Sequence, residues 1–424
     1  MTAALMGSLM GFFIIGVPIA IALGFASVVA LLYSGDVSLL LVAQRMFTAI
    51  DSFSLMAIPF FILAGKLMEN GGISKRLVNF ANTLTGHHTG GLAIVAIVTS
   101  MFFAAISGSS AATVAAVGSI LIPSMINKGY HRNFAGAVSS VSGELGIIIP
   151  PSVPLILYGV TTNTSIGDLF MAGITPGIVI VISLIILVYV IAKKRGYEKE
   201  KKATLAETWK AFKDAILALL MPIIILGGIY GGIFTPTEAA VVAVLYAFII
   251  GAFVYREIKL NNLFEIFVSS GITSAIVLFI IANAGIFGLV LSRENIPAMV
   301  ANFFANITDN PIIFLLLINL LLILVGMFME TSASVIILAP LLTPVAISMG
   351  IDPVHFGIIM IVNLALGMCT PPLGVNLFIS CQIANVKLTS ITRALIPFYF
   401  VLIGVLLLLS YVPIISMWLP NLLK

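Results

Sequence analysis

Small polar residues interrupt strongly apolar parts of this sequence, and their types suit ion binding. The run ISGSSAAT at 106–113 places three serines and a threonine among Phe, Ile, Val and Leu. Similar interruptions are GIIIPPS at 146–152, GMFMETS at 326–332 and GMCTPP at 367–372. A Pro-Pro pair removes two backbone donors and frees carbonyl groups, while glycine lets the chain turn. Freed carbonyls and hydroxyls are hard oxygen ligands, which suit Na+.

The same breaks suit an anion, because helix N-termini carry partial positive charge. No Lys or Arg lies in the central part of any of these motifs. An anionic substrate would therefore depend on helix N-termini and hydroxyl groups. Each motif also has a structural interpretation, since small residues are common at close helix contacts in membranes and a single Pro-Pro pair is more often a kink.

The composition places these motifs in a membrane protein. Of the 424 residues, 61% are hydrophobic and 8% are charged, whereas about a quarter of the residues of soluble proteins are charged. Apolar stretches long enough to span a bilayer recur along the chain. The net charge of +4 comes from short connections, so it is not the signature of a nucleic-acid-binding protein. Cys369 and Cys381 have neither disulfide nor metal-site spacing.

The elements that must position the motifs are helices. We expect nine full spans, near 4–33, 52–68, 134–160, 175–192, 214–234, 237–255, 272–291, 355–382 and 393–418. The first is too long for a signal-peptide core and lacks a basic start, so it is expected to be a retained helix. Regions 91–126 and 312–348 are each too long for one helix and are broken midway, which predicts two re-entrant hairpins. The Pro-Pro pairs predict broken helices at 134–160 and 355–382.

Loop charges predict the orientation. Segment 193–213 contains eight Lys or Arg residues and should be cytoplasmic by the positive-inside rule. The predicted outer loops at 161–174, 235–236 and 349–354 contain no Lys or Arg. We count the predicted spans from this cytoplasmic segment and assume that the two hairpins do not cross the membrane. The first hairpin should then open from the cytoplasm and the second from the opposite side.

The Gly and Pro residues in and around these motifs repeat at an offset of 221 residues. This shift places Pro123 on Pro344, Gly146 on Gly367, and both members of one Pro-Pro pair on the other. The paired broken helices should run in opposite directions, so we predict an inverted repeat, with halves at 1–192 and 214–424 around the basic loop 193–213. Secondary transporters often combine inverted repeats with broken helices near the bilayer midplane. Because the motifs occur in two matching copies, we favour a role in transport over a purely structural role in helix packing.

Other polar residues have two interpretations. Glu144 and Glu330 are acids in apolar stretches and hence functional candidates, although either could be neutral and hold a hairpin in place. Asn376 could face a cavity or pack. The amphipathic stretches 73–84 and 296–307 are expected on the membrane surface, as scaffold braces or ordinary connectors. The four histidines, His355 among them, are expected to be solvated near membrane edges.

Four motifs in order, AAISGSSAATVAAVGSILIPSM, LGIIIPPSVPLILYG, GGIFTPTEAAVVAV and LGMCTPPLGVNLF, resemble the large membrane subunit of tripartite ATP-independent periplasmic (TRAP) transporters. The similarity covers essentially the whole chain. It implies an elevator-type, Na+-coupled importer of organic acids, such as sialic acid or C4-dicarboxylates, in the bacterial inner membrane. It also implies two partners, a small four-helix membrane subunit and a periplasmic substrate-binding protein. The small subunit should be separate, because the first helix begins this chain.

The resemblance also implies site residues, carried over position by position. One Na+ site would use oxygens of Ser107, Ser110, Gly146, Ile149 and Pro151. A second Na+ site would use Gly326, Thr331, Gly367 and Thr370. The substrate would lie between the hairpin tips, near Ser109, Ser152, Glu330 and Asn376.

Two alternatives belong to other classes. A proton-coupled antiporter or exchanger would use Glu144 and Glu330 as proton carriers. An intramembrane hydrolase with Ser109 or Ser110 as nucleophile needs a general base within hydrogen-bond reach. No histidine is expected at membrane depth, and an inverted repeat is not expected for that chemistry. We rank the hydrolase last.

Overall fold

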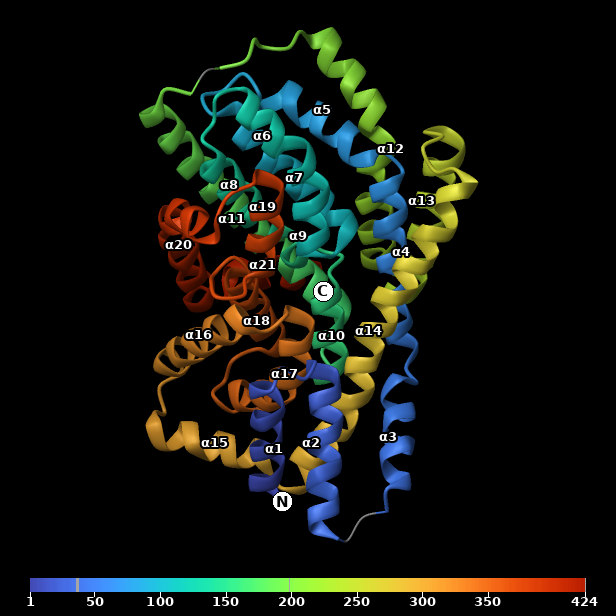
Figure 1. Ribbon diagram of the computed structural model, residues 1–424, viewed down its shortest axis with the longest axis vertical. Coiled ribbons are helices and arrows are strands. Elements are labelled where there is room, and N and C mark those ends of the chain that lie inside the picture. The colour runs from blue at the N-terminus through green and yellow to red at the C-terminus, as the bar shows by residue number, and fades with distance from the viewer. Residues whose placement is uncertain (36–37, 198, 424) are drawn as a thin grey trace.

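The protein is built from helices, many of them long and apolar (Figure 1). The computed structural model describes residues 1–35, 38–197 and 199–423, and no strand occurs among them. Within this part of the chain, nine helices are long and apolar enough to cross a membrane, or ten if one bent pair counts as a single span. Several of these differ from the predicted spans, because hairpin arms at 110–127, 311–328 and 331–348 also have sufficient length.

Two sets of helices follow each other along the chain. The first set is α1 (Thr2–Ile14), α2 (Ile19–Ser34), α3 (Leu40–Ile50), η1 (Phe53–Met56), α4 (Ala57–Asn70), α5 (Ile73–Thr85), α6 (Gly91–Ser107), α7 (Ser110–Asn127), α8 (Arg132–Gly143), α9 (Leu145–Ile148), α10 (Val153–Thr162) and α11 (Ile166–Arg195). The second set is α12 (Leu205–Tyr230), α13 (Pro236–Ile249), η2 (Ile250–Val254), α14 (Leu260–Arg293), α15 (Ile296–Ile307), α16 (Pro311–Phe328), α17 (Thr331–Ser348), α18 (Pro353–Met368), α19 (Val375–Ala384), α20 (Leu388–Tyr411) and α21 (Ile414–Leu423).

The expectation of one helix at 4–33 is wrong. The segment forms α1 and α2, which pack against each other. Gly16 at the break has a φ of 78°, in the left-handed region that favours glycine. Pro18 follows, and the residue before a proline is disfavoured in helical conformation. With 13 and 16 residues, both helices are shorter than the roughly 20 residues that a span needs. Helix α3 was not predicted.

The two predicted hairpin regions each contain two helices, and both predicted breaks are present. Hairpin 1 is α6 and α7, and hairpin 2 is α16 and α17. The helices α8 to α10 form a broken pair bent by 40°, and α18 and α19 flank the second break. Each break holds a cis Pro-Pro bond. The ends of α17, Thr331 and Ser348, lie 221 residues after the ends of α7, so the sequence offset also aligns helix boundaries.

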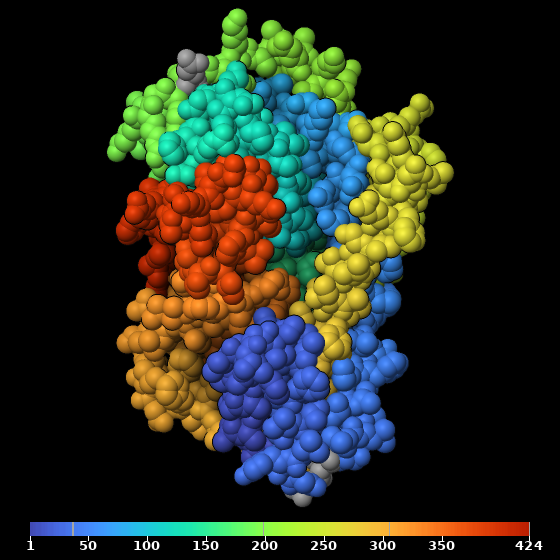
Figure 2. Space-filling view, in the orientation of Figure 1, coloured from blue at the N-terminus to red at the C-terminus, as the bar shows by residue number. Residues whose placement is uncertain are grey.

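The helices after the two breaks exchange partners between the halves. Helix α10 from the first half packs against α17 of hairpin 2, and α19 from the second half packs against α7 of hairpin 1. The long helix α14 contacts α2, α3, α4 and α17. Figure 2 shows the N-terminal helices, in dark blue, next to the orange second hairpin. The hairpins and breaks therefore form a central unit that α2, α4 and α14 border.

The amphipathic stretches form α5 and α15, which lie beside the hairpins. Helix α5 packs against α6, and α15 packs against α17. One expectation about the polar residues is wrong: His355 is buried, not solvated. Its Nδ1 lies 2.6 Å from the hydroxyl of Ser416 and its Nε2 lies 3.3 Å from the carbonyl oxygen of Ser410. These partners come from the end of α20 and from α21, more than fifty residues away along the chain.

Candidate functional site

The tip of hairpin 1 gathers oxygen atoms. Gly108, with a φ of 61°, ends α6, and the Ser109 side chain caps α7 by accepting from the amide of Ala112 at 3.4 Å. The hydroxyls of Ser107 and Thr113 lie 2.9 Å apart. Both also donate to the carbonyl oxygen of Ser109, at 3.3 and 2.8 Å. Two hydroxyls and a carbonyl group therefore meet at one buried point of the turn.

The first break packs directly onto this tip. Gly146 faces the Ser109 carbonyl and the Thr113 hydroxyl so closely that a Cβ atom would not fit. The amide of Val153 donates to the carbonyl oxygen of Gly108 at 3.4 Å, across the same junction. A Cβ at Gly108 would lie 3.0 Å from the carbonyl oxygen of Pro151. The close approach of hairpin and break thus requires glycine on both sides.

Thr113 belongs to this cluster, although it is not among the residues predicted for the first Na+ site. It belongs to the same SGSSAAT run, one helical turn after Ser109, and its side chain is fully buried. The spacing was the available signal, because residues four apart lie on the same face of a helix. Ile149 is buried as well, but its side chain contacts Gly177 of α11, so only its backbone can serve the site.

Ser110 faces the second half of the chain instead of Gly146. Its hydroxyl donates to Oδ1 of Asn376 at 2.9 Å and lies 3.5 Å from Sδ of Met368. Asn376 is fully buried at the start of α19. Ser110 thus links hairpin 1 to the second break.

Hairpin 2 and the second break meet through two glycines. A Cβ at Gly367 would lie 2.5 Å from Cα of Gly326 and 2.9 Å from its carbonyl oxygen. The amide of Leu373 donates to the carbonyl oxygen of Met327 at 3.2 Å, which also ties the break to the hairpin. Backbone carbonyl oxygens are therefore the main groups at this junction that could bind a cation.

The two threonines predicted for the second site make other contacts. The Thr331 hydroxyl lies 2.9 Å from Sδ of Met368, and the Thr370 hydroxyl donates to the carbonyl oxygen of Leu366 at 2.8 Å. Met368 thus receives hydroxyl groups from both hairpins, because Ser110 contacts the same sulfur atom. The junction resembles the first one in its glycine contact and differs in its side-chain partners.

Glu330 caps the second hairpin helix. Its carboxylate accepts from the amides of Ser332 and Ala333, at 2.8 and 3.2 Å, and from the Ser332 hydroxyl at 2.9 Å. A carboxylate at a helix N-terminus satisfies free amides and complements the helix dipole. The structure therefore gives Glu330 a local role at the tip of hairpin 2.

Glu144 is buried between the two breaks. It is 2% exposed, and its Oε1 has no hydrogen-bond partner among the described residues. Its carboxyl group interacts with the thiol of Cys369, which in turn donates to the carbonyl oxygen of Ser140 at 3.1 Å. The Tyr399 hydroxyl donates to the Cys369 carbonyl at 2.6 Å. Unpartnered polar atoms in apolar surroundings cost free energy, so Glu144 is a second functional candidate.

A cavity of about 430 Å³ lies between the hairpin tips. Ser109 and Ser110 line it from hairpin 1, and Glu330 and Ser332 line it from hairpin 2. Thr273 and its neighbours on α14 close the opposite wall. No Lys or Arg is found among its described lining residues.

Two residues predicted for substrate binding lie behind the cavity wall. Ser152 is 1% exposed, donates to the carbonyl oxygen of Ile147 at 2.6 Å, and caps α10. Asn376 lies next to the lining residue Val375 but is itself fully buried. Ser109 and Glu330 do line the cavity.

Comparison with known proteins identifies the family. A sequence model of the "Tripartite ATP-independent periplasmic transporter, DctM component" matches residues 6–415. The chain belongs to this DctM family. It is 42% identical to the C4-dicarboxylate TRAP transporter large permease DctM of Rhodobacter capsulatus, covering 98% of both chains. It is also 42% identical to the sialic acid TRAP transporter large permease SiaM of Vibrio cholerae, covering 97% of both.

Other relatives extend this picture. The isethionate TRAP transporter permease DctMQ of Oleidesulfovibrio alaskensis is 46% identical over 96% of this chain, which spans 64% of that protein. The fold is similar to that in the crystal structure of the Alcanivorax borkumensis YdaH transporter, with a TM-score of 0.65. The two sequences are 17% identical, and the match covers 90% of this chain and 87% of that chain. Like its DctM relatives, this protein is a multi-pass permease of the inner membrane and not an enzyme.

Proposed function

We propose that this DctM protein carries an organic acid, of the sialic acid or C4-dicarboxylate class, into the cell by Na+-coupled secondary transport. The observation that carries the proposal is the cavity lined by both hairpin tips and by α14. Relatives named for C4-dicarboxylates, sialic acid and isethionate support an anionic organic acid as the substrate class.

The charge of the cavity gives a reason for coupling. Its described lining has no basic residue and one carboxylate, that of Glu330. A substrate carboxylate alone would be repelled there, so co-transported cations would make its binding favourable. Glu330 already occupies the N-terminal amides of α17, which leaves the N-terminus of α7, with its neutral Ser109 cap, as the better end for an anion.

The junctions between hairpins and breaks fit Na+ as the co-transported ion. At the first junction, Ser107, Thr113 and the Ser109 carbonyl provide three converging oxygens, with Gly146 packed against them and the Pro151 carbonyl next to Gly108. At the second, the carbonyl group of Gly326 packs closely against Gly367. In this scheme Na+ orders both junctions, and it promotes substrate binding only through higher affinity for the ordered state.

The architecture supports an elevator-type movement of an inverted repeat. The halves 1–192 and 214–424 share helix boundaries at one offset, and the basic segment 193–213 connects them. The central unit of hairpins and breaks would move against α2, α4 and α14, since the cavity lies between the two groups. With segment 193–213 in the cytoplasm, the hairpins open to opposite sides as re-entrant elements.

The proposed system has three components. A small four-helix membrane subunit would pair with this chain, and a periplasmic substrate-binding protein would deliver the acid. The name of the family, a tripartite periplasmic transporter, supports both partners. The lipid bilayer surrounds the assembly, whose apolar outer helices carry exposed Ile, Leu and Phe side chains.

One alternative has a specific observation in its favour. Glu144 is buried, and one of its carboxylate oxygens has no hydrogen-bond partner among the described residues, which fits a proton carrier whose partner approaches only in another conformation. A proton-coupled exchanger would use this residue with Glu330. The capping contacts of Glu330 favour a structural role for that residue, so the alternative depends mainly on Glu144.

The test is uptake into proteoliposomes that contain this chain, its small membrane partner and its binding protein. Radiolabelled sialic acid, succinate and isethionate are compared, each with an inward Na+ gradient, an inward K+ gradient or a pH gradient. Accumulation driven by Na+ supports the proposal and identifies the acid. Accumulation that follows the pH gradient and ignores Na+ contradicts it in favour of the exchanger.

A further inference from the structure

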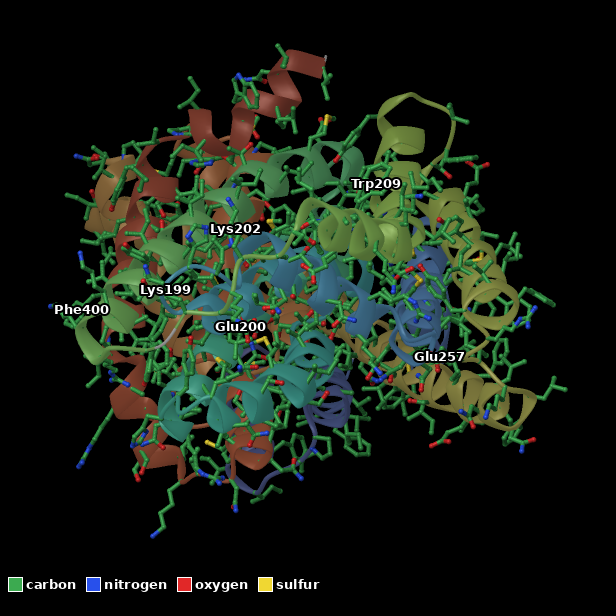
Figure 3. The ribbon with its side chains drawn as sticks, turned by 90° about the horizontal axis from the view of Figure 1, so that it is seen from above. Lys199, Glu200, Lys202, Trp209, Glu257 and Phe400 are labelled. Atoms are coloured by element: carbon green, nitrogen blue, oxygen red, sulfur yellow. The ribbon has the colours of Figure 1, made fainter. Side chains whose placement is uncertain are left out.

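A second open cavity, of about 620 Å³, lies outside the transport site. It is bordered by the connection between α7 and α8, the start of α8, the end of α11 and the first turns of α20. These elements belong to the end of the molecule that carries the basic segment 193–213, seen from above in Figure 3. Two guanidinium groups, those of Arg195 and Arg393, line this cavity.

Among the described residues, neither arginine has an acidic partner of the kind that usually neutralises such a group. No Asp or Glu is found among the described lining residues of the cavity. Arg195 is held by aromatic groups: its guanidinium lies 5.1 Å from the ring centre of Phe134, and it donates to the Tyr197 hydroxyl at 3.3 Å. In the described part of the chain, Arg393 has neither an ion pair nor a hydrogen bond. Both keep free donors for an anion.

The start of α20 adds to the positive potential. This helix has no side-chain cap and no acidic residue in its first turn, and Ser390 from that turn lines the cavity. Uncapped amide groups and the helix dipole both favour an anion at this position. The stacked rings of Tyr130 and Tyr197, 4.2 Å apart, fix the hydroxyl that orients Arg195. Arg195 is therefore held in a fixed orientation, whereas the exposed Arg393 remains free to turn toward a ligand.

Apolar side chains continue from the arginines toward the membrane. On α20, Ile396 and Phe400 follow Arg393 at helical spacing and are 48% and 75% exposed. Helix α11 packs against α20. Its residues Ile186 and Val190, which precede Arg195 in the chain, are 59% and 44% exposed. Figure 3 shows Phe400 at the outer edge of the molecule, on the same side as Lys199. On α20, the basic group of Arg393 is thus followed by exposed apolar side chains on the same helix face.

We propose that this cavity binds the phosphate headgroup of an anionic phospholipid from the cytoplasmic leaflet. Arg195 and Arg393 pair with the phosphate oxygens, and the Ser390 hydroxyl and the uncapped start of α20 add further donors. The acyl chains lie along the apolar stripe of α20 and beside the exposed apolar side chains of α11. Basic pockets between membrane helices on the cytoplasmic side are suited to anionic headgroups, because arginine binds phosphate in bidentate fashion. The apolar stripes favour a lipid over free phosphate.

The test is native mass spectrometry of the purified full-length chain with phosphatidylglycerol, and with phosphatidylcholine as the zwitterionic comparison. The test variants are Arg195→Gln, Arg393→Gln and the double variant. The matched control is Lys201→Gln/Lys202→Gln, which removes two exposed charges from the same basic segment outside the cavity. A parallel series includes inorganic phosphate in large excess. Size-exclusion profiles select the variants that fold, and either single variant suffices if the double variant does not.

We expect wild type to prefer phosphatidylglycerol, and each single arginine variant to lose about tenfold in affinity, equivalent to about 1.4 kcal/mol. The control should bind as wild type does. Equal loss in the control would overturn the proposal, because general surface charge would then explain binding. Complete competition by inorganic phosphate would replace the lipid with a soluble phosphate ligand. Equal binding of the two lipids would also overturn it. None of these outcomes depends on uptake, so they are independent of the transport proposal.

Discussion

The hydroxyl of Ser110 donates a 2.9 Å hydrogen bond to Oδ1 of Asn376, and this buried contact joins hairpin 1 to the helix after the second break. The two residues are 266 positions apart and belong to different halves of the chain. If the hairpins and breaks move as one unit during transport, contacts of this kind must hold the unit together. Removing this contact therefore tests whether it holds the two halves of the chain together.

Ser110→Ala should lower the thermal stability of the purified protein, because it leaves the buried Asn376 amide without its donor. Interhelical hydrogen bonds in membranes contribute about 0.6–2 kcal/mol, so a loss of about 1 kcal/mol is expected. Ser119→Ala is the control, since that hydroxyl donates within its own helix, to Ala116. Scanning calorimetry in detergent measures both. Equal effects of the two substitutions would show that the contact between halves contributes nothing.

Gly367→Ala should abolish Na+-dependent uptake. The added methyl group would collide with the backbone of Gly326, and overpacking of this kind costs about 1–3 kcal/mol. The second break would separate from hairpin 2 and displace its carbonyl groups. Gly404→Ala in α20 is the matched control, because nothing lies within 4 Å of its added Cβ. Wild-type uptake by the Gly367 variant would contradict a tight junction there.

Glu330→Ser should retain most Na+-driven uptake, whereas Glu330→Ala should reduce both stability and uptake. Serine is a good N-terminal cap without a titratable group, and loss of a cap costs about 1 kcal/mol. Uptake and thermal unfolding are measured for both variants. If serine fails as completely as alanine while the protein remains folded, the carboxylate itself is needed and its capping contacts are not the main role.

Glu144→Gln distinguishes Na+ coupling from proton coupling. Glutamine preserves the shape of the buried side chain and removes its titration. We expect Na+-driven uptake to stay within about twofold of wild type, a change smaller than 0.5 kcal/mol by the relation between rate and free energy. Uptake is compared at several pH values with and without a Na+ gradient. Complete loss of uptake in a folded variant would support a proton carrier at this position.

Replacing K+ with Na+ at constant ionic strength should raise the unfolding temperature of the wild-type protein, because an ion that binds only the folded state stabilises that state. Ser107→Ala should weaken this Na+ effect by removing one of the three converging oxygens at the first junction. Ser183→Ala in α11 serves as the control, since that hydroxyl donates within its own helix, to the carbonyl oxygen of Val179. An unfolding temperature that does not respond to Na+ in wild type would contradict the Na+ sites.

Local residue patterns were sufficient to predict much of the fold. Gly and Pro act on the few residues around them, so the breaks at 146–152 and 367–372 and the tips of both hairpins could be located from sequence. The repeat offset of 221 residues predicted matching elements, and the ends of α7 and α17 follow it. Segment 4–33 was one exception, because its high hydropathy concealed the turn at Gly16 and Pro18, and the unpredicted helix α3 was another.

The sequence by itself determined which residues gather at the hairpin tips and breaks, because contacts such as Ser107 with Thr113 are local in the chain. Only the tertiary structure decided which of them face the cavity. It placed Ser109 and Glu330 on the cavity wall, buried Ser152 behind it, and directed Ser110 to Asn376. The physical reason is that α10 and α19 pack against hairpins of the opposite half, and such distant pairings leave no periodic pattern in the sequence.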